Sequence, residues 1–120
     1  MQKMIVKKPW GTYEVLLDEP NYKVKRIVVH HYERFSLQYH KHREEHWVVV
    51  EGDGIVQVNE KEYPAYVRTH WVILPTQKHR ATAGPNGLVF IETQTGNCYE
   101  EDIVRLEDDY GRLDSSEVSV

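Results

Sequence analysis

The chain has 120 residues, of which 40% are hydrophobic and 28% charged, and its formal net charge is −4 with histidine neutral. This length accommodates one domain with a core of its own, and the mildly acidic charge argues against a general attraction to nucleic acid or to an anionic membrane. Cys98 is the single cysteine, which excludes an internal disulfide and is compatible with a reducing cytosol. The N-terminal segment has no apolar stretch typical of a signal peptide, and no apolar run approaches the ~18 residues that span a bilayer. We therefore expect a cytoplasmic protein with no nucleic-acid or membrane partner.

Short segments rich in β-branched and aromatic residues follow one another along the chain, with turn signals between them. We expect strands at 23–32, 36–40, 46–52, 70–75 and 88–96, a hairpin at 52–63, and a strand followed by a turn at 79–87. Residues 98–111 are compatible with a helical turn or with a short edge strand. Strands that recur about every 8–12 residues, without a sustained helical period, predict an all-β sandwich or barrel. Residues 1–113 should form a single domain, and the polar tail 114–120 should be flexible.

The segment SLQYHKHREEHWVVVEG, residues 36–52, concentrates histidines and glutamates before a hydrophobic run. His40 and His42 are two residues apart, so on a strand they point to the same face. Glu45 follows them, and His79 comes after Pro75 at the start of a later strand. An H-x-H pair alone is a weak signal, because most histidines are packed or solvent-facing residues. Together, the four residues indicate a site for a divalent metal ion, and imidazole with carboxylate suits Zn, Mn, Co, Ni or Fe without choosing among them.

Longer strings in the chain resemble a known family. The H-x-H, Glu-x6-Gly and Pro…His pattern is similar to the two motifs of the cupin superfamily. More specifically, the chain resembles the C-terminal cupin domain of type II phosphomannose isomerases, which is often fused behind a mannose-1-phosphate guanylyltransferase domain. The strings that carry this resemblance are KPWGTYEVL at 8–16, YKVKRIVV at 22–29, SLQYHKHREEHWVVVEG at 36–52, LVFIETQTG at 88–96 and EEDIVRLEDDYGR at 100–112.

The resemblance implies a double-stranded β-helix, a cupin jelly-roll barrel with a metal near its interior and a short C-terminal segment. It carries the metal-ligand role to His40, His42, Glu45 and His79, and it implies a homodimer. Glu45 is preferred to Glu44 because the family's glutamate stands directly before His-Trp. The second motif of this chain, PTQKH at 75–79, lacks the family's glycine and is one residue shorter.

The resemblance also implies an activity, a metal-dependent mannose-6-phosphate isomerase that interconverts mannose 6-phosphate and fructose 6-phosphate. Such a reaction needs a Lewis-acid metal, a general acid/base and a cationic group for the phosphate of the phosphorylated hexose. Arg43 is a candidate for a charged group beside the metal, and Glu44 or His46 for the acid/base. The candidates for the phosphate are Arg26, Lys78, Arg80 and Arg112.

Two alternatives stay open. The first is a non-catalytic metal- or sugar-binding cupin module, because a small barrel serves many functions and the fold does not choose among them. The second is a different cupin enzyme, such as an Fe(II) dioxygenase, against which the long match outside the metal motif argues. Arg43 and Glu44 are also compatible with an ordinary surface ion pair. Guanylyltransferase activity is not expected, since this sequence has no Gly-rich phosphate loop.

Overall fold

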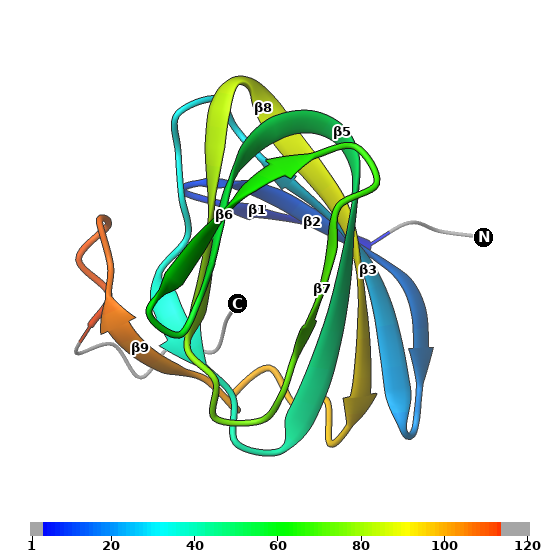
Figure 1. The fold of residues 1–120 in the computed structure, drawn as a ribbon. Helices are drawn as coiled ribbons and strands as arrows, with labels where there is room; N and C mark the ends of the chain where they lie inside the picture. Colours follow the sequence, from blue (N-terminus) through cyan, green and yellow to red (C-terminus); the bar gives the residue numbers. More distant parts are fainter. Residues whose placement is uncertain (1–3, 114–120) are drawn as a thin grey trace.

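The computed structural model describes residues 4–113, which form nine β-strands and no helix. Their pairing is antiparallel throughout, and the sheet curls into a barrel (Figure 1). No helix long and apolar enough to cross a membrane occurs in this part of the chain. The strands are β1 (Met4–Lys8), β2 (Gly11–Glu19), β3 (Tyr22–Val29), β4 (Leu37–Tyr39), β5 (Arg43–Val58), β6 (Lys61–Tyr66), β7 (His70–Ile73), β8 (His79–Gly96) and β9 (Val104–Glu107).

Two long strands, β5 and β8, close the barrel. The first part of β5, 43–52, pairs with 88–96 of β8, and its second part, 54–58, pairs with 79–83. The register shifts at two places, between Val49 and Glu51 and between Gly52 and Gly54. Such bulges bend a strand and increase its twist. Each long strand therefore contributes to both sides of the barrel, with β3 pairing along one half of β8 and β4 along the other.

The bend in β5 depends on two glycines that lie against the neighbouring backbone. Gly52 has a φ of +81°, and a Cβ there would lie 2.1 Å from the carbonyl oxygen of Gly87. A Cβ at Gly54 would lie 2.1 Å from the carbonyl oxygen of Thr82. No side chain can be placed at these distances without moving the backbone, so glycine is required where the bend of β5 packs against the backbone of β8. This explains the glycine that ends the Glu-x6-Gly motif.

The inward-facing side chains change from apolar to polar along the barrel axis. One cross-strand row, formed by β5, β8 and β3, consists of Val49, Phe90 and Ile27. The next row along the strands consists of Trp47, Glu92 and Lys25, and the one after it of Glu45, Gln94 and Lys23. The aromatic core, where Phe35 contacts Trp10, Trp47 and Phe90, therefore occupies one half of the barrel. The other half is lined by buried charged and polar groups.

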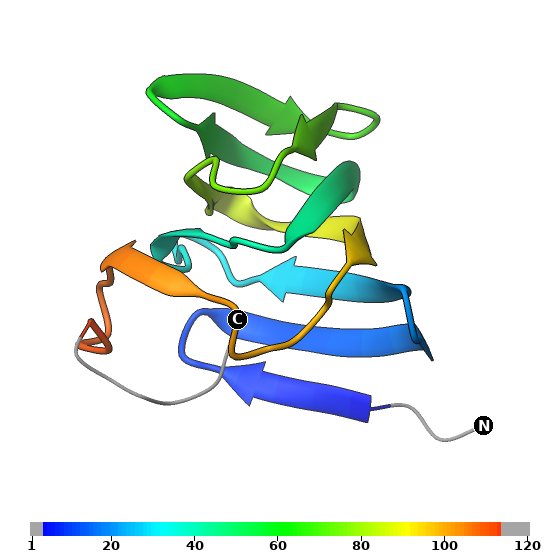
Figure 2. The same cartoon turned by 90° about the horizontal axis from the view of Figure 1, so that it is seen from below.

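The segment 97–103, which we call the strap, runs across the polar end of the barrel from β8 to β9. Figure 2 shows it in orange, viewed from that end. Beyond it, β9 pairs with β4 at the sheet edge, so the edge-strand alternative for residues 98–111 is the correct one. The all-β prediction is confirmed. The N-terminal hairpin of β1 and β2 was not predicted, and the tail 114–120 lies outside the described residues.

Candidate metal centre

Three buried side chains from separate segments converge in the polar half of the barrel. His40 follows β4, Glu45 lies on β5, and His79 begins β8. They are 4%, 1% and 1% exposed. Nε2 of His40 lies 3.3 Å from Oε2 of Glu45, and Nε2 of His79 lies 3.6 Å from Oε1. One ligand atom from each residue lies within 4.8 Å of the others, so a single cation can contact all three.

Backbone carbonyls fix the tautomers of both imidazoles. Nδ1 of His40 lies 2.5 Å from the carbonyl oxygen of Asp102, and Nδ1 of His79 lies 2.9 Å from that of Gln77. A carbonyl oxygen only accepts, so each Nδ1 carries the proton and each Nε2 presents its lone pair to the cluster. Burial lowers the pKa of His40 to about 4 and also lowers the pKa of His79. Both rings are therefore neutral at pH 7, the form that binds metal.

Glu45 supplies the negative charge of the cluster. Burial alone would raise the pKa of this carboxyl group, but His40 and His79, once acid protonates them, and the Arg43 guanidinium hold that pKa far below its usual range. The carboxylate also accepts a hydrogen bond from Nε1 of Trp47 at 3.0 Å, which orients it. A fixed carboxylate between two neutral imidazoles is a suitable ligand set for a divalent first-row metal.

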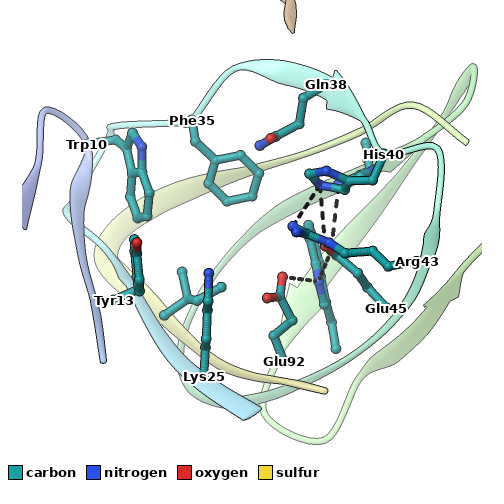
Figure 3. Close-up of a pocket in the computed structure, with 12 residues that line it drawn as sticks. Trp10, Tyr13, Lys25, Phe35, Gln38, His40, Arg43, Glu45 and Glu92 are labelled. Carbon is teal, nitrogen blue, oxygen red and sulfur yellow. Dashed lines mark hydrogen bonds and ion pairs between the residues drawn. The ribbon is translucent and has the colours of Figure 1, made fainter. Parts of the chain in front are cut away.

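Gln38 supplies a fourth polar group to the interior. Its residue pairs with His79 across β4 and β8, and its side chain is buried and points into the barrel beside the cluster (Figure 3). Within the described part of the chain, Oε1 of Gln38 has no hydrogen-bond partner. A buried, unpaired carbonyl oxygen is costly unless something binds it. Gln38 is therefore a candidate fourth ligand for a metal ion held by His40, Glu45 and His79.

His42 lies outside this group, contrary to the expectation from the H-x-H pair. Strand β4 ends at Tyr39 and β5 begins at Arg43, so residues 40–42 form a turn and alternation does not apply to them. The His42 side chain is exposed, while its amide N–H donates to Oδ2 of Asp102 at 2.9 Å. The two side chains that share the interior are Gln38 and His40, which are also two residues apart. The pair that faces the interior therefore lies two residues earlier in the sequence than the expected pair, His40 and His42.

Arg43 is buried at the cluster rather than paired with Glu44. Its Nε donates to Oε2 of Glu45 at 2.8 Å, and its NH2 donates to Nε2 of His40 at 3.1 Å (Figure 3). A third nitrogen, NH1, donates to the carbonyl oxygen of Tyr99 at 3.3 Å. The guanidinium thus contacts the Nε2 lone pair of His40 and the Oε2 atom of Glu45, and a metal ion would need both of these ligand atoms. Arg43 and a metal ion compete for the same ligand atoms.

Replacing Arg43 by methionine should therefore strengthen metal binding. The variant removes the competing cation and leaves Glu45 a full negative charge for the metal. Because a charge-assisted hydrogen bond is worth ~1.5–3 kcal/mol, we expect the Zn²⁺ dissociation constant to fall about tenfold. Calorimetric titration of the chelator-stripped protein measures it. An Arg43→Lys variant keeps the charge and should bind Zn²⁺ close to the original affinity; equal affinities for all three proteins would contradict the competition.

The expected acid/base residues, Glu44 and His46, lie on the outer face of β5. Oε2 of Glu44 is 2.7 Å from Nε2 of His46, and both side chains reach solvent, so neither contacts the interior. The interior holds Glu92 instead, whose carboxyl group accepts from Nε1 of Trp47 at 3.1 Å and from Nε2 of Gln94 at 2.6 Å. Burial and the charge of Glu45 raise the pKa of Glu92 to about 8. Glu92 is therefore a protonated hydrogen-bond donor at pH 7, which the sequence reasoning missed.

None of the four expected phosphate-binding residues lines the cavity beside His40, Glu45 and His79, which we call the His/Glu cluster. Each is paired elsewhere in the described structure. Arg26 contacts Glu51, Lys78 contacts Glu60, Arg80 contacts Glu107 and the carbonyl oxygen of Phe35, and Arg112 contacts Asp108. The cation that does line the cavity, besides Arg43, is Lys25, which is 2% exposed. Alternation along β3 places Lys25 inside and Arg26 outside.

The cavity itself is nearly filled. It is bounded by the His/Glu cluster, Arg43, Glu92 and Lys25 on its polar side and by Trp10, Tyr13 and Phe35 on the other (Figure 3). Its free volume is about 10 Å³, which is room for one water molecule. A single metal ion can be accommodated there, whereas a sugar requires the strap or the Arg43 side chain to move.

Sequence comparisons relate this chain to a known family and to longer proteins. The family described as mannose-6-phosphate isomerase C-terminal matches residues 1–108. A mannose-1-phosphate guanylyltransferase of Klebsiella pneumoniae is 36% identical over 108 residues, and the alginate biosynthesis protein AlgA of Pseudomonas aeruginosa is 40% identical over 109. These matches cover 88% and 89% of this chain but 23% of each relative, so the chain spans about a quarter of their length.

Solved structures show the same fold at low identity. An RmlC-like cupin of Shewanella frigidimarina superposes with a TM-score of 0.74 at 20% identity, covering 81% of this chain and 86% of the other. A double-stranded β-helix protein of Klebsiella pneumoniae gives 0.69 at 18% identity, with 78% and 82% covered. The predicted cupin jelly roll is therefore confirmed. The expectation of a mannose-6-phosphate isomerase is overturned, because the curated relatives are named mannose-1-phosphate guanylyltransferases, which is a different activity.

Proposed function

Because the chain belongs to the family of mannose-6-phosphate isomerase C-terminal cupin domains, we propose that it is a divalent-metal-binding module that binds a phosphorylated hexose in its barrel. The observation that carries this proposal is the buried cluster of His40, Glu45 and His79, in which both Nε2 lone pairs face the same carboxylate.

The donor set supports a metal of the Zn, Mn, Co, Ni or Fe type. Two neutral imidazoles, one carboxylate and the unpaired amide oxygen of Gln38 offer nitrogen and oxygen ligands without thiolate. Their summed charge is −1, so a divalent ion would leave the site with a net positive charge. Such an ion would polarise hydroxyl or carbonyl oxygens of a bound sugar.

The walls of the cavity support a sugar ligand. The protonated carboxyl group of Glu92 and the guanidinium of Arg43 are hydrogen-bond donors, while Trp10 and Trp47 provide apolar ring surface. Pockets that combine apolar rings with a few oriented polar groups are typical of small-molecule sites. The curated relatives carry names that refer to mannose 1-phosphate, which directs the choice of ligand to a phosphorylated mannose.

Calorimetry on the chelator-stripped chain tests the proposal. Zn²⁺, Mn²⁺, Co²⁺ and Ni²⁺ are titrated first, and the metal-loaded protein is then titrated with mannose 6-phosphate, mannose 1-phosphate or unphosphorylated mannose. We expect one metal per chain and binding of a mannose phosphate that weakens when the metal is removed. Absence of metal binding, or sugar-phosphate affinity that is the same with and without metal, would refute the proposal.

A further inference from the structure

Two lysines on β3 point into the polar end of the barrel and share one partner. Nζ of Lys25 lies 2.6 Å from Oε1 of Glu100, and Nζ of Lys23 lies 3.3 Å from the same oxygen. Both lysines are buried, and Lys23 also donates to the carbonyl oxygen of Cys98 at 3.1 Å. Lysine is rarely buried without a matching anion. Here the anion comes from the strap.

The strand register places these lysines opposite the His/Glu cluster. Lys25 pairs with Glu92, and Lys23 pairs with Gln94, whose partner on β5 is Glu45. Lys23 and Glu45 are therefore two strand spacings apart, about 10 Å between their backbones. A ligand that reaches from the metal across Glu92 meets the two ammonium groups at its other end.

Hydrogen bonds hold the strap over this end of the barrel. The carbonyl oxygen of Tyr99 accepts from Arg43, and the carboxylate of Asp102 accepts from the amides of Lys41 and His42 at 2.9 Å each. Glu100 fills the place between the lysines. Burial works to raise the pKa of Glu100, but Lys25 and Lys23 hold it below its usual range, so the carboxylate is ionised.

Only one of the two carboxylate oxygens of Glu100 is hydrogen-bonded at this position. One oxygen accepts from both lysines, while Oε2 is buried and has no hydrogen-bond partner among residues 4–113. A phosphate monoester carries up to two negative charges and three acceptor oxygens. It would match two ammonium groups better than a single carboxylate oxygen does.

We propose that Lys23 and Lys25 form the phosphate subsite of the pocket, and that the phosphate of a bound sugar displaces the Glu100 carboxylate when the strap opens. This inference rests on the proposed function and names the part of the site that would hold the phosphate. In this proposal the Glu100 carboxylate of the strap occupies the subsite until the ligand binds.

Binding of inorganic phosphate to the metal-free protein tests the subsite apart from the metal. Lys25→Met should weaken phosphate binding about tenfold or more, whereas Arg26→Met, one residue along the same strand on the outer face, should leave it unchanged. Glu100→Gln should strengthen phosphate binding about tenfold, and Glu101→Gln, at an exposed neighbouring position, should not. Calorimetry gives each dissociation constant, and circular dichroism checks that each variant is folded.

Equal phosphate affinity in Lys25→Met and in the original protein would overturn the subsite, as would a Glu100→Gln variant that binds no more tightly. If Lys25→Met does not fold, Lys23→Met provides the same comparison from the less buried lysine. The two proposals fail separately. Lysine-dependent phosphate binding without any metal binding keeps the subsite and rejects the metal module, whereas metal-dependent sugar-phosphate binding that ignores both lysines keeps the module and rejects the subsite.

Discussion

Replacing His40 by alanine is expected to abolish metal binding at micromolar metal, whereas the same replacement at His42 leaves it intact. Nε2 of His40 faces Glu45 inside the barrel, and the His42 side chain is in solvent. Loss of a residue that only orients a metal ligand costs ~10–100-fold in affinity, so loss of the ligand itself should cost about 100-fold or more. The measurement is calorimetric titration of Zn²⁺ into both stripped variants.

The pair is well matched because the two histidines belong to the same H-x-H motif and differ in what their side chains contact. His79→Ala should behave as His40→Ala does, since its Nε2 faces the same carboxylate. Thermal unfolding of the stripped proteins separates loss of metal from loss of fold. A large drop in affinity in His42→Ala as well as in His40→Ala would show that the ligand set is the one expected from the sequence and not the one in the structure.

The strand pattern was predictable because most strands alternate or are β-branched and end at turn signals. The long bends of β5 and β8 were harder to predict, because they depend on a close approach of Gly52 to Gly87 that only the folded barrel reveals. The N-terminal hairpin escaped prediction for another reason. Its second strand, β2, mixes charged and apolar residues as GTYEVLLDE, and its outer half is exposed, so hydrophobic periodicity is weak there.

The residues of the His/Glu cluster were only partly predictable. His40, Glu45 and His79 come together, even though the second motif is short. The turn at 74–77 closes through the Gln77 side chain, which accepts from the Leu74 amide at 2.8 Å, and the Thr76 amide donates to the His40 carbonyl at 2.7 Å. Alternation on a strand placed His42 on the same face as His40, because nothing in the sequence shows that β4 ends at Tyr39.

The polar interior of β3 and β8 carried a signal that alternation could have revealed. Glu92 and Gln94 continue the inward series begun by Leu88 and Phe90, and Lys25 stands in the same position relative to Ile27. Charged residues in phase with a buried apolar face place ionisable groups inside the fold, and buried ionisable groups are candidates for a functional site. By contrast, no pattern in the sequence shows that Glu100 crosses back to these lysines. The expected homodimer stays a prediction.

Glu92→Gln should change how the stability of the protein depends on pH. The pKa of Glu92 rises from 4.5 to about 8 on folding, so between these values the native state holds a proton that the unfolded state has lost. The free energy of unfolding therefore falls as the pH rises, by about 3 kcal/mol from this group between pH 5 and pH 7. Glutamine cannot ionise, so its amide stays neutral and keeps an acceptor oxygen for Trp47 at every pH.

The variant should consequently gain stability over the original protein by about 3 kcal/mol on going from pH 5 to pH 7. His40 and His79 work in the opposite direction, because their lowered pKa values make the fold lose stability as the pH falls below 6.5. Since both histidines are present in both proteins, the difference between the two urea-unfolding series, measured without metal at pH 5, 6, 7 and 8, isolates Glu92. Parallel curves would mean that Glu92 is ionised inside the barrel, which would leave two adjacent carboxylates facing Lys25 and Arg43 and would remove the hydrogen-bond donor assigned to the sugar.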